Sequence, residues 1–184
     1  MRIVAISGSL RSGSHNTGLL RSVAEEAPDG VELVLWHGLR EIPPYDADHD
    51  VVPGPPEVEA FRAIVREADA VLIATPEYNS SIPGQLKNAL DWGSRPIATN
   101  VFRNKPVAVI GSSSGMFGAV WAQAELRKVL AAMGARVAEV EVAVGRTQDK
   151  LDEDGRLVDE DVRDQLRDAL ATLSAEATPV LAAA

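Results

Sequence analysis

Residues 2–7 read Arg-Ile-Val-Ala-Ile-Ser, residues 70–75 read Ala-Val-Leu-Ile-Ala-Thr, and residues 106–111 read Pro-Val-Ala-Val-Ile-Gly. Apart from their end residues, these three runs are continuously apolar. Strands show this pattern when helices cover both faces of a parallel sheet, because neither face then meets water. The three runs therefore predict the central strands of an α/β fold.

Two further runs predict the edges of the same sheet. In Val31–Trp36 and in Arg136–Val142, apolar residues of one face alternate with glutamates or other residues on the opposite face. Alternation indicates a strand with one less buried face, as at a sheet edge. Placing the second and fifth strands at the edges gives the order 2-1-3-4-5. A dinucleotide-binding sheet of order 3-2-1-4-5-6 would bury the second strand and need a sixth.

Helical patterns separate the five strands. The predicted helices cover residues 14–27, 56–67, 83–93, 118–133 and 159–176. Strand and helix alternate along the whole chain, as in successive βαβ units. We therefore expect one domain over residues 1–177, built as a three-layer sandwich with a five-stranded parallel sheet in the middle. The tail, residues 178–184, is expected to fray.

Composition argues against several classes of function. The chain has 184 residues, no cysteine and a formal net charge of −9. Without cysteine there is no disulfide, thiolate nucleophile or Cys-ligated metal, and an acidic chain lacks the basic footprint that nucleic-acid binding requires. Nine acidic and four basic residues lie between Asp149 and Asp168. We interpret this run as a solvated helix face, in preference to an acidic docking surface.

The sequence also bears on location. No run approaches the ~20 apolar residues that span a bilayer. The first strand turns to Ser and Gly after residue 6, unlike a secretory signal. We therefore expect a cytoplasmic protein that does not bind a membrane.

The segment after the first strand has the composition of a phosphate-binding loop. Residues 7–17 read Ser-Gly-Ser-Leu-Arg-Ser-Gly-Ser-His-Asn-Thr and lead into a predicted helix, whose N-terminus offers free N–H groups to an anion. Arg11 adds a guanidinium group. Further side-chain donors come from Ser9, Ser14, Asn16 and Thr17. A nucleotide-triphosphate loop would need Lys and Ser/Thr where Ser14 and His15 stand, so we expect a terminal phosphomonoester instead.

The segments after the third and fourth strands complete a candidate site. Residues 75–84, Thr-Pro-Glu-Tyr-Asn-Ser-Ser-Ile-Pro-Gly, form a stiff loop with a tyrosine, an amide and hydroxyls. Residues 111–118, Gly-Ser-Ser-Ser-Gly-Met-Phe-Gly, are small enough for a backbone to approach a ligand closely. Taken singly, the two segments could be a capped turn and a flexible serine loop. Ligands of open α/β sheets bind where the strand order reverses, and all three segments should meet there.

Three motifs resemble those of the NADPH-dependent FMN reductase family, flavodoxin-like enzymes that include bacterial quinone and chromate reductases. The motifs are GSLRSGSHN at 8–16, TPEYNSSIPGQLKNALDWGSR at 75–95 and SSSGMFGAVWAQAELR at 112–127. The resemblance extends to the order of strands and helices up to about residue 175. It implies a flavodoxin-like fold, FMN as cofactor, NADPH or NADH as co-substrate, and a small-molecule electron acceptor.

The same resemblance implies roles for individual residues. The FMN phosphate would be held by Ser9, Arg11, Ser14, Asn16 and Thr17. The isoalloxazine ring and ribityl chain would be lined by Pro76, Glu77, Tyr78 and Asn79, and flanked by Ser112, Ser113 and Gly115. His15 would be peripheral. Members of the family are usually homodimers or homotetramers with the flavin near the interface, so Asp91, Trp92 and Arg95 are expected to reach toward a neighbouring subunit's site.

Together, these inferences predict an NAD(P)H-dependent oxidoreductase that reduces quinones, or else chromate, azo compounds or free flavin, by ping-pong hydride transfer. The cofactor carries the redox chemistry, so no catalytic side chain or metal is required. His37 and His49 are expected at the surface. Two alternatives remain open: a flavodoxin-like electron carrier, and a flavin-binding protein without activity. The physiological acceptor, the preferred nicotinamide and the choice between dimer and tetramer also stay open.

Overall fold

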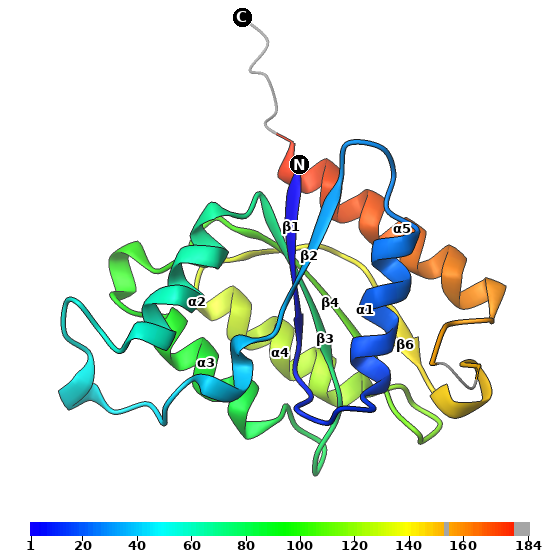
Figure 1. Ribbon diagram of the computed structural model, residues 1–184, viewed down its shortest axis with the longest axis horizontal. Helices are drawn as coiled ribbons and strands as arrows, with labels where there is room; N and C mark the ends of the chain where they lie inside the picture. The colour runs from blue at the N-terminus through cyan, green and yellow to red at the C-terminus, as the bar shows by residue number, and fades with distance from the viewer. Residues whose placement is uncertain (153–154, 179–184) are drawn as a thin grey trace, which may run out of the picture.

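The computed structural model describes residues 1–152 and 155–178. Its centre is a twisted parallel sheet with helices on both faces (Figure 1). The strand order is β2-β1-β3-β4-β5, with β6 also paired to β4, so the predicted order is confirmed. The strands are β1 (Arg2–Ser7), β2 (Glu32–Trp36), β3 (Ala70–Thr75), β4 (Pro106–Ser112), β5 (Arg136–Val137) and β6 (Ala143–Val144).

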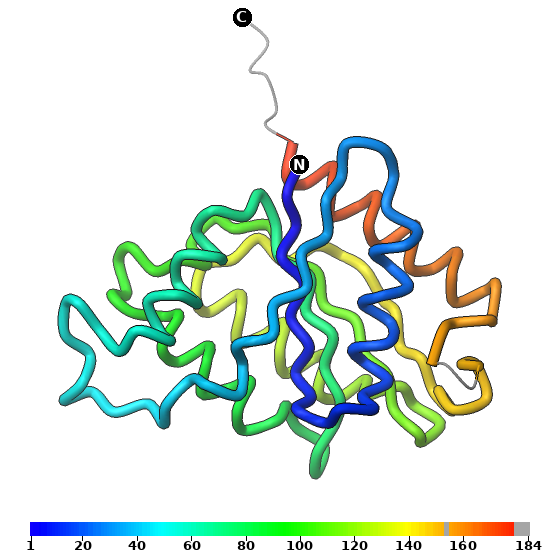
Figure 2. Tube along the Cα trace, in the orientation of Figure 1, coloured from blue at the N-terminus to red at the C-terminus, as the bar shows by residue number. Residues whose placement is uncertain are grey.

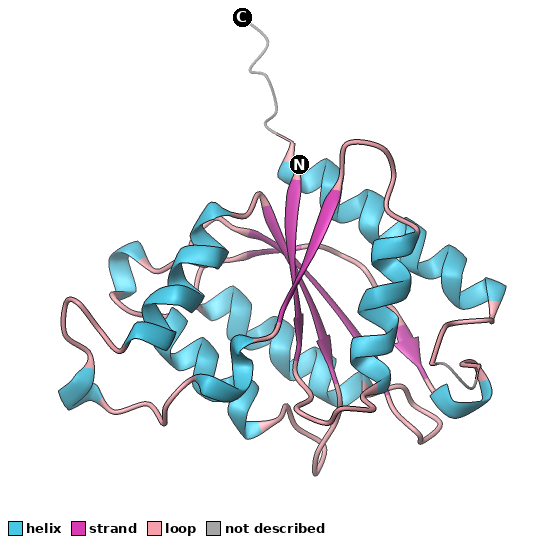
Figure 3. Ribbon diagram, viewed as in Figure 1, coloured by secondary structure: helices cyan, strands magenta, loops and turns pink. Residues whose placement is uncertain are grey.

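Five α-helices are present in the described part of the chain, close to the predicted ranges. They are α1 (His15–Glu25), α2 (Pro56–Glu67), α3 (Gly84–Gly93), α4 (Val120–Ala132) and α5 (Glu160–Ala177). Figure 3 shows α1 and α5 on one side of the sheet and α2, α3 and α4 on the other. Thr178 follows α5, and the predicted fraying of residues 179–184 lies outside the described residues. Among the described residues, no helix combines the length and the apolar character needed to cross a bilayer.

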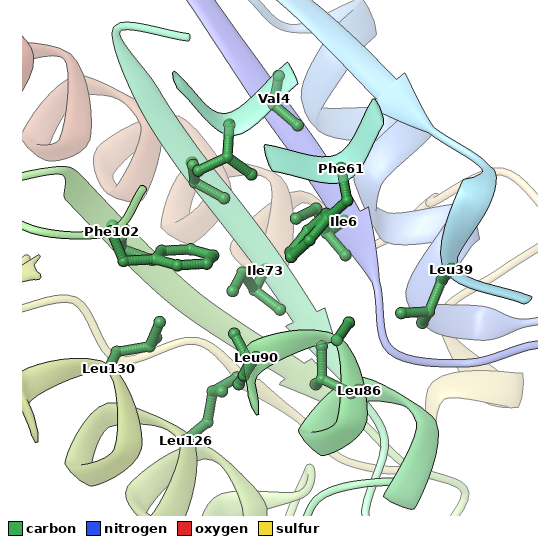
Figure 4. Packing of buried hydrophobic residues seen from close by; sticks show 14 of the residues in the cluster. Val4, Ile6, Leu39, Phe61, Ile73, Leu86, Leu90, Phe102, Leu126 and Leu130 are labelled. Atoms are coloured by element: carbon green, nitrogen blue, oxygen red, sulfur yellow. The ribbon is translucent and has the colours of Figure 1, made fainter. Parts of the chain in front are cut away.

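The two helical layers enclose two separate hydrophobic cores. On one face, Leu19 of α1 and Leu166 of α5 pack against Ile3 and Leu72 of the sheet. On the other face, aromatic and aliphatic side chains of α2, α3 and α4 meet the sheet, as Figure 4 shows for Phe61, Leu90 and Leu126. Every residue of β3 and β4 is buried, whereas none of β2 is. This difference confirms the assignment of the continuous apolar runs to the centre and of β2 to an edge.

A buried arginine fixes the long connection between β2 and α2, which Figure 2 shows extending to the side of the molecule. The guanidinium of Arg62 bonds Asp50 at 3.0 Å and Glu59 at 2.8 Å, and donates to the backbone carbonyl of Trp92 at 3.0 Å. The Trp92 indole N–H donates to the Pro43 carbonyl at 2.9 Å. The connection also includes short 3₁₀ turns at Gly38–Glu41 and Ala47–His49. It is therefore bound to α2 and α3 along its length.

The acidic run between Asp149 and Asp168 forms the exposed face of the first turns of α5 and the segment that precedes this helix. One side of α5 is buried through Val162, Leu166 and Leu173, and the acidic residues lie on the other side. The Lys150 ammonium, at 2.8 Å, lowers the pKa of Asp159, whose carboxylate also caps α5 by accepting from the Val162 N–H. The interpretation as a solvated face is thus confirmed for the described part of the run; residues 153–154 lie outside it.

The fifth strand differs from the sequence prediction. Instead of one strand over Arg136–Val142, β4 pairs with two-residue strands at either end, β5 and β6. Between them, the Val140 N–H bonds the Ala138 carbonyl two residues back and so leaves the ladder. The Arg127 guanidinium of α4 fills the gap, donating to the carbonyls of Val109 at 3.2 Å and Val140 at 2.6 Å. A side chain from a helix thus replaces part of the strand pairing.

We predict that Arg127→Ala destabilises the protein by roughly 2–3 kcal/mol, the scale of lost hydrogen bonds to a charged group. Burial lowers the pKa of Arg127, but a guanidinium stays protonated, so its hydrogen bonds should persist across the working pH range. Urea unfolding measures the loss. The exposed neighbour Lys128 provides the control, because Lys128→Ala removes a charge from the same helix without touching the gap. Equal stability of the two variants would contradict this role for Arg127.

Candidate functional site

The segments that follow β1, β3 and β4 lie together at one end of the sheet, the lower end in Figure 1. We call them the first loop (residues 8–14), the second loop (residues 76–83) and the third loop (residues 113–119). A backbone hydrogen bond of 2.8 Å from the Gly8 N–H to the Ala74 carbonyl joins the starts of the first two. A side chain on Gly8 would press on Leu86 and Pro76. The first and second loops are therefore closely packed where they leave the sheet.

All three loops contribute to one hollow of about 350 Å³. It brings together nine of the residues predicted for the site: Ser9, Arg11, Ser14, Asn16, Pro76, Glu77, Tyr78, Ser112 and Ser113. His15, which was expected to be peripheral, and Ser114 also line it. The sequence could have indicated this position for His15. Ser14 is the N-cap of α1, so His15 is the first residue of the helix and lies directly after the first loop.

Three predicted residues do not line this hollow. The Thr17 hydroxyl instead donates to the Ser7 hydroxyl at 2.9 Å. Asn79 is exposed at the tip of the second loop with a φ of 54°. The Gly115 carbonyl accepts from the Arg146 N–H at 2.8 Å, which holds it against the segment after β6. That these three residues contact a bound cofactor directly stays a prediction, because none of them lines this hollow.

Asn16 fastens the first helix to the end of β4. Its amide nitrogen donates to the Ser112 carbonyl at 3.1 Å, and its amide oxygen accepts from the Ser112 N–H at 3.0 Å. The side chain is only 3% exposed. Its polar atoms therefore serve the backbone of Ser112, and what Asn16 can offer an anion is the N–H of its own first-turn backbone.

Two polar groups in the hollow stand out because nothing in the described chain engages them. The Ser112 hydroxyl is buried and has no hydrogen-bond partner. Among the described residues, the Arg11 guanidinium takes part in no hydrogen bond or ion pair, although the Arg11 N–H reaches the Ser9 hydroxyl at 3.4 Å. A buried hydroxyl without a partner is costly. In the described structure, the hollow is thus lined by one guanidinium that could bind an anion and by one residue whose buried hydroxyl lacks a hydrogen-bond partner.

The second loop is a rigid hairpin. Tyr78 and Ser81 exchange two backbone hydrogen bonds of 3.0 and 3.1 Å. Asn79 and Ser80 between them both have positive φ, the conformation of a two-residue type I′ turn. The Thr75 hydroxyl donates to the Pro76 carbonyl at 2.8 Å at the base of the loop. The Tyr78 ring is held at the rim and is half exposed.

A second, larger hollow of about 580 Å³ adjoins the first and shares Arg11 and Tyr78 with it. Its lining mixes apolar groups such as Leu10 and Pro83 with a second guanidinium, that of Arg40. The Arg40 Nη2 donates to the Leu10 carbonyl at 2.6 Å, so the side chain is held beside the first loop. Among the residues that the structure describes, no acidic side chain lines this hollow.

Of the three residues expected near a neighbouring subunit, Trp92 departs from the prediction, and for Asp91 and Arg95 it stays a prediction. The Trp92 ring is 1% exposed and packs edge-on to Tyr45, so it cannot reach a partner. Arg95 stacks over the Tyr45 ring and donates to its hydroxyl at 3.2 Å, and Asp91 pairs with Lys87. The expectation is wrong for Trp92 because its indole N–H is engaged by the Pro43 carbonyl.

His37 and His49 are exposed, as predicted.

Comparison with known proteins identifies the family of this chain. The sequence profile described as "NADPH-dependent FMN reductase" matches residues 1–149. The chain belongs to this family. The family assignment makes the protein an oxidoreductase that depends on FMN and NAD(P)H. It also confirms the resemblance that the three motifs indicated.

Individual relatives cover nearly the whole chain. The NAD(P)H-dependent FMN reductase of Pseudomonas aeruginosa is 41% identical over 174 residues, which are 94% of this chain and 93% of that protein. The quinone reductase of Escherichia coli is 39% identical over 169 residues, 90% of this chain and 89% of its own. Among solved structures, FerB, a flavoenzyme NAD(P)H:(acceptor) oxidoreductase from Paracoccus denitrificans, matches with a TM-score of 0.84 at 32% identity, covering 95% of this chain and 98% of FerB.

We predict that Asn16→Asp lowers the free energy of unfolding by about 1–3 kcal/mol, because the carboxylate cannot donate to the Ser112 carbonyl and leaves two oxygens facing each other. Thermal or urea unfolding of the protein without added cofactor measures this loss. Asn104→Asp is the matched control, since Asn104 is exposed and has a positive φ that Asp also tolerates. An Asn16→Asp variant as stable as the control would show that the two hydrogen bonds between the Asn16 side chain and the Ser112 backbone do not contribute to stability.

Proposed function

We propose that this FMN-dependent oxidoreductase passes electrons from NAD(P)H to a quinone or a similar small acceptor, with FMN held in the 350 Å³ hollow between the three loops. The observation that carries the proposal is the pair of unengaged groups in that hollow, the buried Ser112 hydroxyl and the Arg11 guanidinium. FMN brings a phosphate and a ring with polar edges, which are the two kinds of partner that these groups lack.

The residues present fit FMN in size and chemistry. The hollow falls within the range of about 300–1,000 Å³ that is usual for small-molecule sites. A guanidinium can grip a phosphate with two hydrogen bonds. The hydroxyls of Ser9 and Ser14 and the first-turn N–H groups of α1 add further donors at the first loop. The three convergent loops would thus provide a phosphate site and a ring site within one hollow.

We assign roles accordingly. The phosphate would be bound by Ser9, Arg11, Ser14 and the backbone N–H of Asn16. The ring and ribityl chain would lie against Pro76, Tyr78, Ser112 and Ser113. Thr17, Asn79 and Gly115 would act through the loop backbones that they shape, since they do not line the hollow. We place all of these groups in a single domain over residues 1–177.

Bound FMN would supply the redox chemistry that couples the nicotinamide donor to the acceptor. The protein's part is to bind and orient. The stiff hairpin of the second loop and the anchored third loop would hold a flat ring between them, and hydrogen bonds from these loops to its polar edge would tune its electron affinity. The exposed rim at Tyr78 leaves room for a second planar molecule to reach the ring.

The adjoining 580 Å³ hollow is the proposed place for the substrates that enter in turn. Its apolar lining suits an aromatic acceptor, and its two guanidinium groups suit the phosphates of a nicotinamide donor. The names of the relatives support a quinone as the acceptor: besides the Escherichia coli quinone reductase, a relative from Arabidopsis thaliana is named NADPH:quinone oxidoreductase.

We further propose that the protein is a homodimer or homotetramer in the cytoplasm. Exposed apolar side chains support self-association: Met116, Phe117 and Trp121 at and after the third loop are at least half exposed. Contiguous apolar surface of this kind marks interaction sites on soluble proteins. Size-exclusion chromatography with light scattering would give the oligomer directly.

The central experiment is anaerobic mixing of FMN-loaded protein with NADPH and, separately, with NADH. We expect flavin absorbance to bleach within seconds with at least one donor and to return when a quinone is added. The rates would also show which donor is preferred. Bound flavin that neither donor reduces would favour an electron carrier, and protein that takes up no FMN would refute the proposal.

Arg11→Ala should weaken FMN binding by roughly 1.5–3 kcal/mol, the scale of a hydrogen bond to a charged group. Quenching of flavin fluorescence on titration gives the dissociation constant. Arg103→Ala is the control, because Arg103 is an exposed arginine beside the start of β4, at the opposite end of the sheet. Unchanged affinity in Arg11→Ala would remove Arg11 from the phosphate site.

A further inference from the structure

The start of α4 lacks a cap of its own. The residue before it, Ala119, has a left-handed backbone with a φ of 62° and only a methyl side chain. The Val120 N–H donates to the Phe117 carbonyl at 3.2 Å, and the Gln123 N–H donates to the Ala119 carbonyl at 3.0 Å. That leaves the N–H groups of Trp121 and Ala122, which have no partner within the helix.

Glu77 of the second loop supplies the missing cap. One carboxylate oxygen, Oε2, accepts from the Trp121 N–H at 3.1 Å and from the Ala122 N–H at 3.2 Å. The donors are 44 and 45 residues further along the chain, so the contact is tertiary. A carboxylate is also the favoured charge at a helix N-terminus. The acidic residue of the second loop therefore completes the helix that follows the third loop.

The opposite side of the third loop is already fixed. The Thr147 hydroxyl donates to the Ser113 carbonyl at 2.8 Å. Gly118 lies so close to the Ala143 carbonyl that a side chain there would collide with it, and Gly145 is in the same position against the Met116 carbonyl. The third loop is thus attached to the segment after β6 on one side and to Glu77 on the other. Glu77 ties it to the second loop.

We propose that Glu77 is a positioning residue, whose carboxylate holds the second and third loops at the spacing that the FMN ring requires. The proposal rests on the proposed function, because it assigns FMN to the hollow that these two loops line. Glu77 belongs to that lining, but its Oε2 is used by α4. Its contribution to FMN binding therefore passes through Trp121 and Ala122 and the loop that precedes them.

This arrangement has a signature in the protein without cofactor. Trp121 is half exposed, its backbone N–H is one of the two that Glu77 caps, and its ring lies edge-on to Phe117 with centroids 5.2 Å apart. Losing the cap should loosen the first turn of α4 and with it this aromatic pair. We expect a changed tryptophan emission, with Trp121→Phe in the same background assigning the change.

The test compares three variants. Glu77→Ala removes the cap, Glu77→Gln keeps an acceptor oxygen without the charge, and Asp159→Ala removes the equivalent carboxylate cap of α5 far along the chain. Both alanine variants should lose stability, and Asp159→Ala at least as much as Glu77→Ala because it also loses the ion pair with Lys150. The FMN dissociation constant should rise about fivefold or more in Glu77→Ala, which corresponds to the loss of one cap. It should stay near wild type in Asp159→Ala and largely recover in Glu77→Gln.

Several results would overturn the proposal. An unchanged FMN dissociation constant in Glu77→Ala would do so, as would equal weakening in Glu77→Ala and Asp159→Ala, which would indicate general destabilisation. A Glu77→Gln variant that regains wild-type stability and yet binds FMN as weakly as Glu77→Ala would point to the charge acting directly on the flavin. If wild-type protein bound no FMN, the proposed function would fail instead, while the tryptophan emission of the cofactor-free variants would still report on the cap.

Discussion

The amide of Asn16 satisfies both backbone polar groups of Ser112, and this reciprocal pair sets the geometry of the site. Ser112 is the last residue of β4, where the sheet no longer provides a partner on every side. Buried backbone groups must be paired, and here the partner comes from the first helix. Because α1 and β4 are joined in this way, the first and third loops leave the sheet at a fixed distance from each other. That distance in turn sets the width of the hollow between the two loops.

Helix α4 links this hollow to the edge of the sheet. Its first turn depends on Glu77, from the second loop. Gln123 near the start of the helix and Arg127 one turn later donate to carbonyls along the interrupted fifth strand. A displacement of the helix would therefore alter both the site and the sheet edge. The protein uses side chains of one helix where a longer fifth strand would have used backbone pairing.

Much of this architecture could be predicted from local pattern. Continuous apolar runs identified β1, β3 and β4, and the three loops after them contain most of the residues that line the hollow. What could not be predicted depends on partners distant in sequence. The break near Val140 is filled by Arg127, and no periodicity reveals that. Trp92 was misjudged because its carbonyl partner, Pro43, lies in an irregular segment. The capping role of Glu77 was missed because its helix begins more than forty residues later.

The broken fifth strand has a consequence for the behaviour of the protein at high concentration. A long, regular edge strand exposes a row of unpaired N–H and C=O groups that another sheet can extend, which is a common route to aggregation. Here that edge offers only β5 and β6, two residues each, separated by a turn whose carbonyls are partly occupied by Arg127. Intermolecular strand pairing has no continuous template on this side. We therefore expect the interruption to protect this edge against fibrillar assembly.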